Sequence, residues 1–384
     1  MKIICKKHQC TGCEACSNIC PQKCIAMRSD GEGFLYPDID NERCVDCKQC
    51  SNVCPVNKLP GNNDSSSLVF VGTLIDENER IKSSSGGVFY ALAESVLDQK
   101  GVVYGASFTK ELEVVHMGVT EKEQLYKLRG SKYVQSRIAT VYSEIREHLL
   151  KKRLVLFSGT PCQIAGLKSF LRKEYDNLIT CDIICHGVPS PGLFALSLKY
   201  IKSKVKKEII KYSFRSSEIW GDFSSNIITA DLKKKSLAGF SNFYMMSFMK
   251  NLCFREACYH CIYANENRIG DITLGDYWGI SGLRLLNCDI SKGMSLVIAN
   301  TIKGRMILQE NKYIILEKRS YLEASKKNAN MKYSTIRPSL RDSYYVDVNR
   351  MSIQCFCKKY DIAPKYTFKE LLGSYVNRIK GIQI

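Results

Sequence analysis

The sequence CTGCEACSNICP at residues 10–21 recurs as CVDCKQCSNVCP at residues 44–55. Each copy holds four cysteines in the spacing C-x2-C-x2-C-x3-C-P. The first three thiolates of a copy can occupy three corners of one [4Fe-4S] cluster, while the fourth cysteine points toward a second cluster. The ligand sets are therefore expected to cross between the copies. One predicted cluster takes Cys10, Cys13, Cys16 and Cys54, and the other takes Cys44, Cys47, Cys50 and Cys20.

Two other kinds of site use closely spaced cysteines. Paired C-x-x-C units can form a zinc ribbon, and a cysteine-dense segment can be a disulfide scaffold. Neither explains the third cysteine in each triplet. Pro21 and Pro55 are expected to end the short helices that carry the fourth ligands, because proline bars further helix growth. The repeat therefore predicts a small bacterial two-cluster ferredoxin domain over residues 1–58.

The remaining chain is long enough for a large domain, because the sequence has 384 residues in total. More than half of the 19 cysteines in the whole sequence sit where metal clusters account for them. Such clusters need reduced thiolates, which favours the cytoplasm. The N-terminus lacks the apolar run of a signal peptide, and no stretch approaches the ~18 to 20 apolar residues of a membrane span. We expect a soluble protein without a transmembrane segment.

The formal net charge of +18 is unevenly distributed. Residues 1–60 contain eight Lys/Arg and seven Asp/Glu, so almost the whole excess lies in the remainder of the chain. Basic residues occur there as scattered pairs and triplets, such as Lys233, Lys234 and Lys235, without a nucleic-acid-binding motif. We expect anionic cofactors or substrates rather than nucleic acid as partners.

Beyond a polar linker at residues 59–67, short apolar segments alternate with amphipathic ones. This alternation predicts an α/β domain over residues 68–320 with a mainly parallel sheet, together with α+β elements. A basic extension of uncertain structure follows at 321–384, where 369–382 has helical spacing typical of a packing helix. The expected strands are 68–75, 102–108, 113–119, 154–159, 178–185, 272–279 and 294–300, and the expected helices lie near 87–99, 138–151, 163–173, 191–205 and 303–311.

The segment SSSGG at residues 83–87 comes directly before one expected helix. Backbone N–H groups at such a terminus can face an anion, and glycine lets a phosphate approach closely. The segment could therefore hold the diphosphate of a nucleotide cofactor. Ordinary helix capping by Ser85 accounts for the composition equally well.

Five further cysteines lie in the large domain in positions that favour metal binding. Cys162 follows a buried strand at an expected helix N-terminus, where the helix dipole favours a thiolate. Cys185 ends the next strand, and Cys258 and Cys261 form a C-x2-C pair near Cys253. Four of these thiols could hold a third cluster, although buried cysteines without a metal are the alternative. The other cysteines have no spacing partner and are interpreted as structural: Cys5, Cys24, Cys181, Cys288, Cys355 and Cys357.

The order of the motifs closely resembles the coenzyme F420 hydrogenase/dehydrogenase beta-subunit family. The cysteine repeat is followed by SSSGGVFYALAESVL, LRGSKYVQS, FSGTPCQIAGL, ICHGVPSP, and FREACYHC before GDITLGDYWG. The resemblance spans roughly residues 10–300. It implies an iron–sulfur flavoprotein with FAD beside a [4Fe-4S] cluster, in which the flavin exchanges hydride with a deazaflavin coenzyme or an organic substrate.

The resemblance also implies site residues. If the resemblance holds, the ligands of the third cluster are Cys162, Cys185, Cys258 and Cys261. Cys253 falls outside the family motif. Many relatives occur in bacteria that lack the deazaflavin coenzyme, so the hydride partner stays open. The candidate FAD contacts are Ser83, Ser84, Ser85, Gly86, Gly87, Ser131, Lys132, Tyr133, Gln135 and Ser136.

A flavin joins two-electron hydride chemistry to one-electron carriers. The expected function is therefore an oxidoreductase that connects a ferredoxin or partner subunit to an organic hydride partner. His186 and Asp276 are candidates to relay the proton, with structural hydrogen bonding as the alternative. Two other functions stay open, namely an electron-transfer subunit without substrate chemistry and a non-enzymatic interaction protein of a polysaccharide locus. The sequence leaves the oligomeric state open, and a homo-oligomer is one option.

Overall fold

The computed structural model describes residues 2–61, 67–215, 220–237, 239–280 and 288–362. The helix expected at 369–382 and most of the expected linker lie outside these residues. Within them, no helix is both long enough and apolar enough to cross a membrane.

An eight-stranded sheet forms the centre of the large domain, in the order β13-β3-β12-β11-β7-β6-β4-β5. The neighbours β4, β6, β7 and β11 are parallel, while β5 and the strands beyond β11 are paired antiparallel. The predicted α/β class with a mainly parallel sheet is confirmed, with antiparallel strands at both flanks. The strands are β3 (Leu68–Leu74), β4 (Val102–Phe108), β5 (Val114–Val119), β6 (Val155–Gly159), β7 (Leu178–Ile183), β11 (Ile272–Asp276), β12 (Ser295–Ala299) and β13 (Ile314–Arg319).

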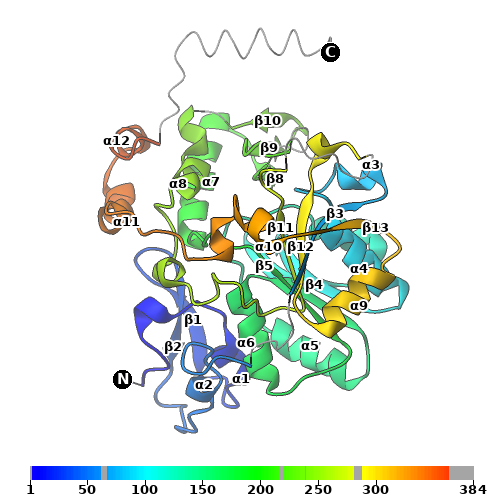
Figure 1. The fold of residues 1–384 in the computed structure, drawn as a ribbon. Helices are drawn as coiled ribbons and strands as arrows, with labels where there is room; N and C mark the ends of the chain where they lie inside the picture. The colour runs from blue at the N-terminus through cyan, green and yellow to red at the C-terminus, as the bar shows by residue number, and fades with distance from the viewer. Residues whose placement is uncertain (1, 62–66, 216–219, 238, 281–287, 363–384) are drawn as a thin grey trace, which may run out of the picture.

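Helices cover both faces of this sheet (Figure 1). Val102 and Tyr104 of β4 pack with α5 and α6, whereas Val103 points to the other face and packs with α4. Burial on both faces explains the continuous apolar runs of the central strands. The helices and 3-10 turns of this layer are α3 (Glu77–Arg80), α4 (Val88–Asp98), η2 (Lys122–Lys127), α5 (Val141–Leu150), α6 (Pro161–Leu171), η5 (Ile290–Lys292), α9 (Ile302–Glu310), α10 (Tyr321–Ser325) and η6 (Ala329–Met331).

A second, smaller sheet and a group of helices form an aromatic core beside the large sheet. Phe194, Phe214, Tyr244, Tyr344 and Phe356 belong to one buried cluster there. The last two residues come from the segment predicted as a C-terminal extension, so residues up to 362 of that segment help to build the core. The elements are α7 (Pro191–Val205), β8 (Ile209–Ser213), β9 (Asn226–Thr229), β10 (Lys234–Ser236), η3 (Gly239–Asn242), α8 (Phe243–Met249), η4 (Glu256–His260), α11 (Arg341–Arg350) and α12 (Ile353–Lys359).

The cysteine repeat forms a small unit that lies against α6 at one end of the large domain (Figure 1). Its contact contains apolar groups, with Ala15 and Val53 in one buried cluster with residues of α6, and polar ones. The carboxylate of Glu14 accepts hydrogen bonds from the backbone N–H groups of Ile138 at 2.9 Å and Ala139 at 3.1 Å. Gly33 approaches Gly192 so closely that a side chain on either would collide. The unit contains η1 (Lys7–Gln9), α1 (Ala15–Ile19), β1 (Ile25–Ser29), β2 (Leu35–Ile39) and α2 (Gln49–Asn52).

Candidate functional site

Each cysteine loop turns twice through left-handed backbone, at equivalent steps of the repeat. Gly12 and Glu14 have φ of 67° and 62°, and Asp46 and Lys48 have φ of 53° and 56°. The left-handed region costs a non-glycine residue roughly 1–2 kcal/mol, so it persists only where the surrounding structure requires it. These turns wrap the first three cysteines of each copy around a hollow.

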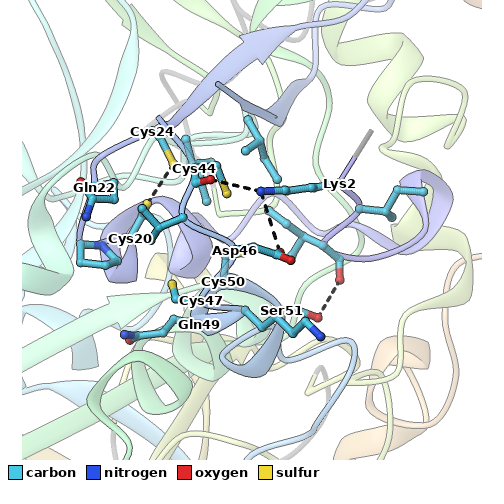
Figure 2. A pocket seen from close by; sticks show the side chains of 17 residues that line it. Lys2, Cys20, Gln22, Cys24, Cys44, Asp46, Cys47, Gln49, Cys50 and Ser51 are labelled. Carbon is cyan, nitrogen blue, oxygen red and sulfur yellow. Dashed lines mark hydrogen bonds and ion pairs between the residues drawn. The ribbon is translucent and has the colours of Figure 1, made fainter. Parts of the chain in front are cut away.

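The two hollows collect the cysteines in the grouping that the crossed pattern predicts. The first hollow, of about 20 Å³, is lined by the four thiols of one predicted set and by Cys5. The second, of about 70 Å³, is lined by the other set and by Cys24, whose Sγ lies 3.4 Å from that of Cys20 (Figure 2). The fourth cysteine of each copy thus lies at the hollow of the other copy, although its role as a ligand stays a prediction.

Cys5 and Cys24 were interpreted as structural, and the structure places both thiols beside predicted ligands. A hydrogen bond from the Cys5 thiol lowers the pKa of Cys10 to about 6 and that of Cys54 to about 7. Burial, followed by the neighbouring Cys20 thiol, raises the pKa of Cys24 to about 11. Each hollow therefore presents five thiols rather than four.

The third set of thiols comes from three separate segments of the large domain. Cys162 lies in the first turn of α6. This helix begins with a capping box formed by Thr160 and Gln163. Cys185 follows β7, while Cys258 lies in η4 and Cys261 directly after it.

The four thiols of this set lie within electrostatic reach of one another. Burial raises the pKa of Cys185 well above its usual range, and Cys258, Cys162 and Cys261 raise it further. Burial likewise raises the pKa of Cys162 to about 12, so desolvation outweighs the expected effect of the helix dipole. Buried thiolates need a compensating positive charge, which bound iron would supply.

Cys253 lies apart from this set. Its side chain is fully buried in the aromatic core, and its carbonyl oxygen accepts a hydrogen bond from the Tyr345 hydroxyl at 2.7 Å. Cys181 is buried within β7 on the opposite face of the sheet from the cysteine sets. Both positions fit packing roles for these two cysteines.

The first hollow and the third set adjoin each other across α6. A Cβ added at Gly166 of α6 would lie 3.1 Å from the Sγ of Cys13. The hydroxyl of Tyr263 is buried and has no hydrogen-bond partner among the described residues. Burial raises the pKa of Tyr263, and the thiols of Cys162 and Cys13 raise it further, which places the ring between the two sets. A cluster sulfur would give this hydroxyl an acceptor, so the residues present fit iron–sulfur clusters.

The two loops expected to contact FAD meet beside Asp276, at the end of β11 in the large sheet. The Ser131 backbone N–H donates to the Ser84 hydroxyl at 2.9 Å. Arg215 donates to the Tyr133 hydroxyl at 2.7 Å, to the Ser84 carbonyl oxygen at 2.8 Å, and to the Asp276 carboxylate at 2.6 Å. The buried Arg215 guanidinium therefore donates hydrogen bonds to three segments, each of which belongs to a different sequence motif.

Three aromatic residues lie beside these contacts. The Trp220 ring nitrogen donates to the Asp276 carboxylate at 3.0 Å, and its ring stacks on Trp278 with centroids 5.3 Å apart. The Arg215 guanidinium lies 4.5 Å from the centroid of the Phe223 ring. The sequence motifs did not identify Arg215 or Trp220, because both follow a short strand in a region without a clear pattern.

Within the SSSGG segment, the glycines face protein rather than open space. A Cβ at Gly86 would lie 2.4 Å from the carbonyl oxygen of Gly72, and Gly87 has a φ of 83° as the N-cap of α4. Ser85 donates to the carbonyl oxygen of Met294 at 2.8 Å and does not cap the helix. The capping alternative is therefore wrong, and the glycines are required by packing and turn geometry.

Three other candidate FAD contacts are engaged within the protein. The Lys132 ammonium donates to the carbonyl oxygen of Arg129 at 2.7 Å, and burial lowers its pKa to about 7. The Gln135 amide donates to the carbonyl oxygen of Thr11 at 3.2 Å, and the Ser136 hydroxyl pairs with His116. Among the candidates, Ser84 and Tyr133 are linked to Asp276 through Arg215, and Ser131 is linked to Ser84.

His186 and Asp276, the candidate proton-relay residues, lie near each other at this edge. Burial lowers the pKa of His186, and the Asp276 carboxylate opposes that shift. Both oxygens of Asp276 already accept hydrogen bonds from Arg215 and Trp220. A structural role for Asp276 is thus visible, and a role in proton transfer stays a prediction.

Comparison with known families accounts for both parts of the chain. Residues 9–58 match the model of the 4Fe-4S dicluster domain, and residues 152–323 match the model for the C terminus of the coenzyme F420 hydrogenase/dehydrogenase beta subunit. The predicted resemblance to this beta-subunit family, with an N-terminal ferredoxin domain, is confirmed over these residues. The two matches indicate an iron–sulfur electron-transfer protein related to oxidoreductase subunits.

No curated protein gives a match. Among solved structures, the chain is similar at 15% identity and a TM-score of 0.44 to a chain of the F420-reducing [NiFe] hydrogenase complex from Methanosarcina barkeri. That alignment covers 65% of this chain and 81% of the other chain.

Proposed function

We propose that the protein is an iron–sulfur flavoprotein oxidoreductase that passes electrons between a low-potential carrier and an organic hydride partner. The carrier would be a ferredoxin or a partner subunit. The hydride partner would be an anionic organic substrate or a deazaflavin coenzyme. The proposed cofactors are the two clusters of the ferredoxin domain, a third [4Fe-4S] cluster at Cys162, Cys185, Cys258 and Cys261, and FAD.

The observation that carries this proposal is the continuity of the three thiol sets. The second hollow opens at the surface, the first lies against α6, and the third set begins at Cys162 on that same helix. Cys185 is followed by His186, which lies near Asp276 and the Arg215 contacts. Electron carriers arranged in this order would connect the surface of the ferredoxin domain to the edge of the large sheet.

The expected FAD loops lie where open α/β sheets bind ligands, beyond the carboxyl ends of the parallel strands. β6, β7 and β11 end there, at Gly159, Ile183 and Asp276. Bound FAD would supply the junction between hydride transfer and single-electron transfer. Ser84, Ser131 and Tyr133 would hold it, and the positive excess of the large domain would favour its diphosphate.

The chain's own residues would then orient the reacting partners. Arg215 fixes the Ser84 and Tyr133 segments through direct hydrogen bonds, and Asp276 holds the guanidinium in place. His186, whose pKa burial lowers, would be neutral at pH 7 and able to accept a proton. The stacked Trp220 and Trp278 rings would exclude water from this edge.

The test is anaerobic purification of the full chain with iron, sulfide and flavin quantified together. Since each [4Fe-4S] cluster holds four irons, the proposal predicts about twelve irons and twelve sulfides per chain, with one flavin. Protein with about eight irons and no flavin, even after incubation with FAD or FMN, would contradict it.

A second candidate function is an electron relay that serves a partner dehydrogenase without substrate chemistry of its own. It is favoured by the contacts of Gly86, Lys132, Gln135 and Ser136, which engage the protein itself. Intact protein with all its clusters and without any affinity for flavin would establish this relay instead.

A further inference from the structure

Arg255 lies at the junction between the first hollow and the third thiol set. It precedes η4, so the same short segment carries Arg255, Cys258 and Cys261. Its side chain is completely buried. The guanidinium reaches back to the ferredoxin domain, where Nε donates to the Cys10 carbonyl oxygen at 2.6 Å and Nη2 lies 3.6 Å from the Cys10 Sγ.

The remaining partners of this guanidinium are neutral. It donates to the Gln135 side-chain oxygen at 3.0 Å and to the Leu35 carbonyl oxygen at 3.1 Å, and it lies 4.0 Å from the centre of the Tyr36 ring. Among the described residues, no carboxylate forms an ion pair with Arg255. A buried charge without a counter-charge is strongly unfavourable.

Of the other buried arginines, Arg80 donates to the backbone carbonyl oxygens of Gly293 and Asp289, whereas two arginines pair with a carboxylate. Arg341 pairs with the Glu32 carboxylate at 2.6 Å, and Arg268 pairs with that of Asp182 at 3.0 Å. Arg255 has a thiol in the place of the carboxylate. A four-thiolate [4Fe-4S] cluster has a net charge of about −2 when oxidised and about −3 when reduced, so a cluster in the first hollow would supply the missing negative charge.

We propose that Arg255 is a positioning residue that donates to the Cys10 thiolate and raises the reduction potential of the cluster in the first hollow. Reduction adds one electron to that cluster, and a nearby buried cation favours the more negative, reduced form. Because the inference rests on the 4Fe-4S dicluster domain, it requires neither FAD nor the third cluster.

The same cation adjoins the third thiol set, because Arg255 is the N-cap of η4, which contains Cys258 and is followed directly by Cys261. Its removal would therefore act on electron transfer between the ferredoxin domain and the large domain. The cluster in the second hollow should be unaffected, since Lys2 is the cation beside Cys44 there.

The experiment is an EPR-monitored redox titration of the full chain, purified anaerobically, with the first-hollow signal assigned by its loss in Cys16→Ala. Arg255→Met should move that midpoint potential to more negative values and leave the second cluster unchanged. Arg255→Lys keeps the positive charge but lacks the planar guanidinium group with its several N–H donors. It should therefore shift the midpoint potential less, in the same direction. Arg341→Met is the matched control, because its guanidinium also joins the ferredoxin domain but pairs with Glu32.

An unchanged potential in Arg255→Met with the cluster intact would overturn the inference, as would an equal shift in Arg341→Met. If Arg255→Met fails to fold or loses the cluster, Arg255→Lys provides the test. An unshifted midpoint potential in Arg255→Lys would then contradict the proposal. Flavin content is measured on the same samples. Missing flavin would contradict the proposed function and leave the inference about Arg255 standing.

Discussion

The two cysteine hollows share one sequence pattern but occupy different surroundings. In the first, Cys13, Cys16 and Cys54 are buried at 8%, 9% and 7% exposure, and Gly166 of α6 in the large domain lies against the Cys13 side chain. In the second, Cys47 is exposed, and the exposed side chain of Val45 lies at the rim. Docking of the ferredoxin domain therefore makes the repeat asymmetric, with an inner site facing the third thiol set and an outer site facing solvent.

The largest effect is expected from Cys16→Ala, which removes a thiol of the inner site. The variant should lose about four irons and all electron delivery to the large domain, because each cluster holds four irons and the inner site lies on the route. Iron analysis and EPR of the reduced protein measure both. Loss of the outer cluster in place of the inner one would contradict the assignment of Cys16 to the inner site.

The next effect is expected from Cys20→Ala at the outer site. It should destabilise the outer cluster and spare the inner one, because Cys20 lies at the outer hollow despite belonging to the first copy of the repeat. Cys24 lies beside it and could partly replace the thiol. The double variant Cys20→Ala/Cys24→Ala should therefore lose the outer cluster faster in air. Selective loss of the inner signal in either protein would contradict this assignment.

A smaller effect is expected where α6 meets the inner site. Gly166→Ala places a methyl group 3.1 Å from the Cys13 Sγ and 2.8 Å from the Tyr142 hydroxyl, so it should destabilise the chain by about 1–3 kcal/mol. Anaerobic thermal unfolding measures the change. Gly31→Ala is the control, since nothing lies within 4 Å of the added Cβ. Equal stability of both variants would mean that α6 does not pack against the inner site.

The smallest effect concerns pH and the loop that borders the inner site. Burial lowers the pKa of Lys132 to about 7 from an ordinary value of 10.5. The unfolded chain then binds more protons between these two values, so the stability of the native protein relative to Lys132→Met should rise as pH increases from about 7 to 10.5. Melting temperatures of both proteins across that range provide the measurement. A constant difference would show that Lys132 is not desolvated.

The sequence was most informative where one interaction dominates. The fully buried strand β12 and the buried first three residues of β6 appear as apolar runs, and the cysteine spacing groups the thiols around each hollow. The aromatic core was missed because its residues, such as Phe214 and Tyr344, are far apart in the sequence and show no period. The C-terminal helices α11 and α12 were likewise hidden by basic composition.

The candidate cofactor loops could be located from sequence, but their contacts could not. Composition alone does not show that Gly86 packs on the backbone of Gly72, or that Gln135 turns toward the ferredoxin domain. Arg215 lies outside the quoted motifs, Arg255 lies inside FREACYHC without a role of its own there, and only the fold shows what their guanidinium groups join. Sites built by long-range hydrogen bonds leave no local signal in the sequence.

The asymmetry between the hollows is tested most directly by EPR of the fully reduced chain, compared with that of Cys258→Ala. If the third thiol set holds a cluster beside the inner site, the reduced protein should show a spin–spin interaction that disappears in Cys258→Ala, while the outer cluster persists. An identical spectrum and identical iron content in the two proteins would contradict the proposed route from the ferredoxin domain into the large domain.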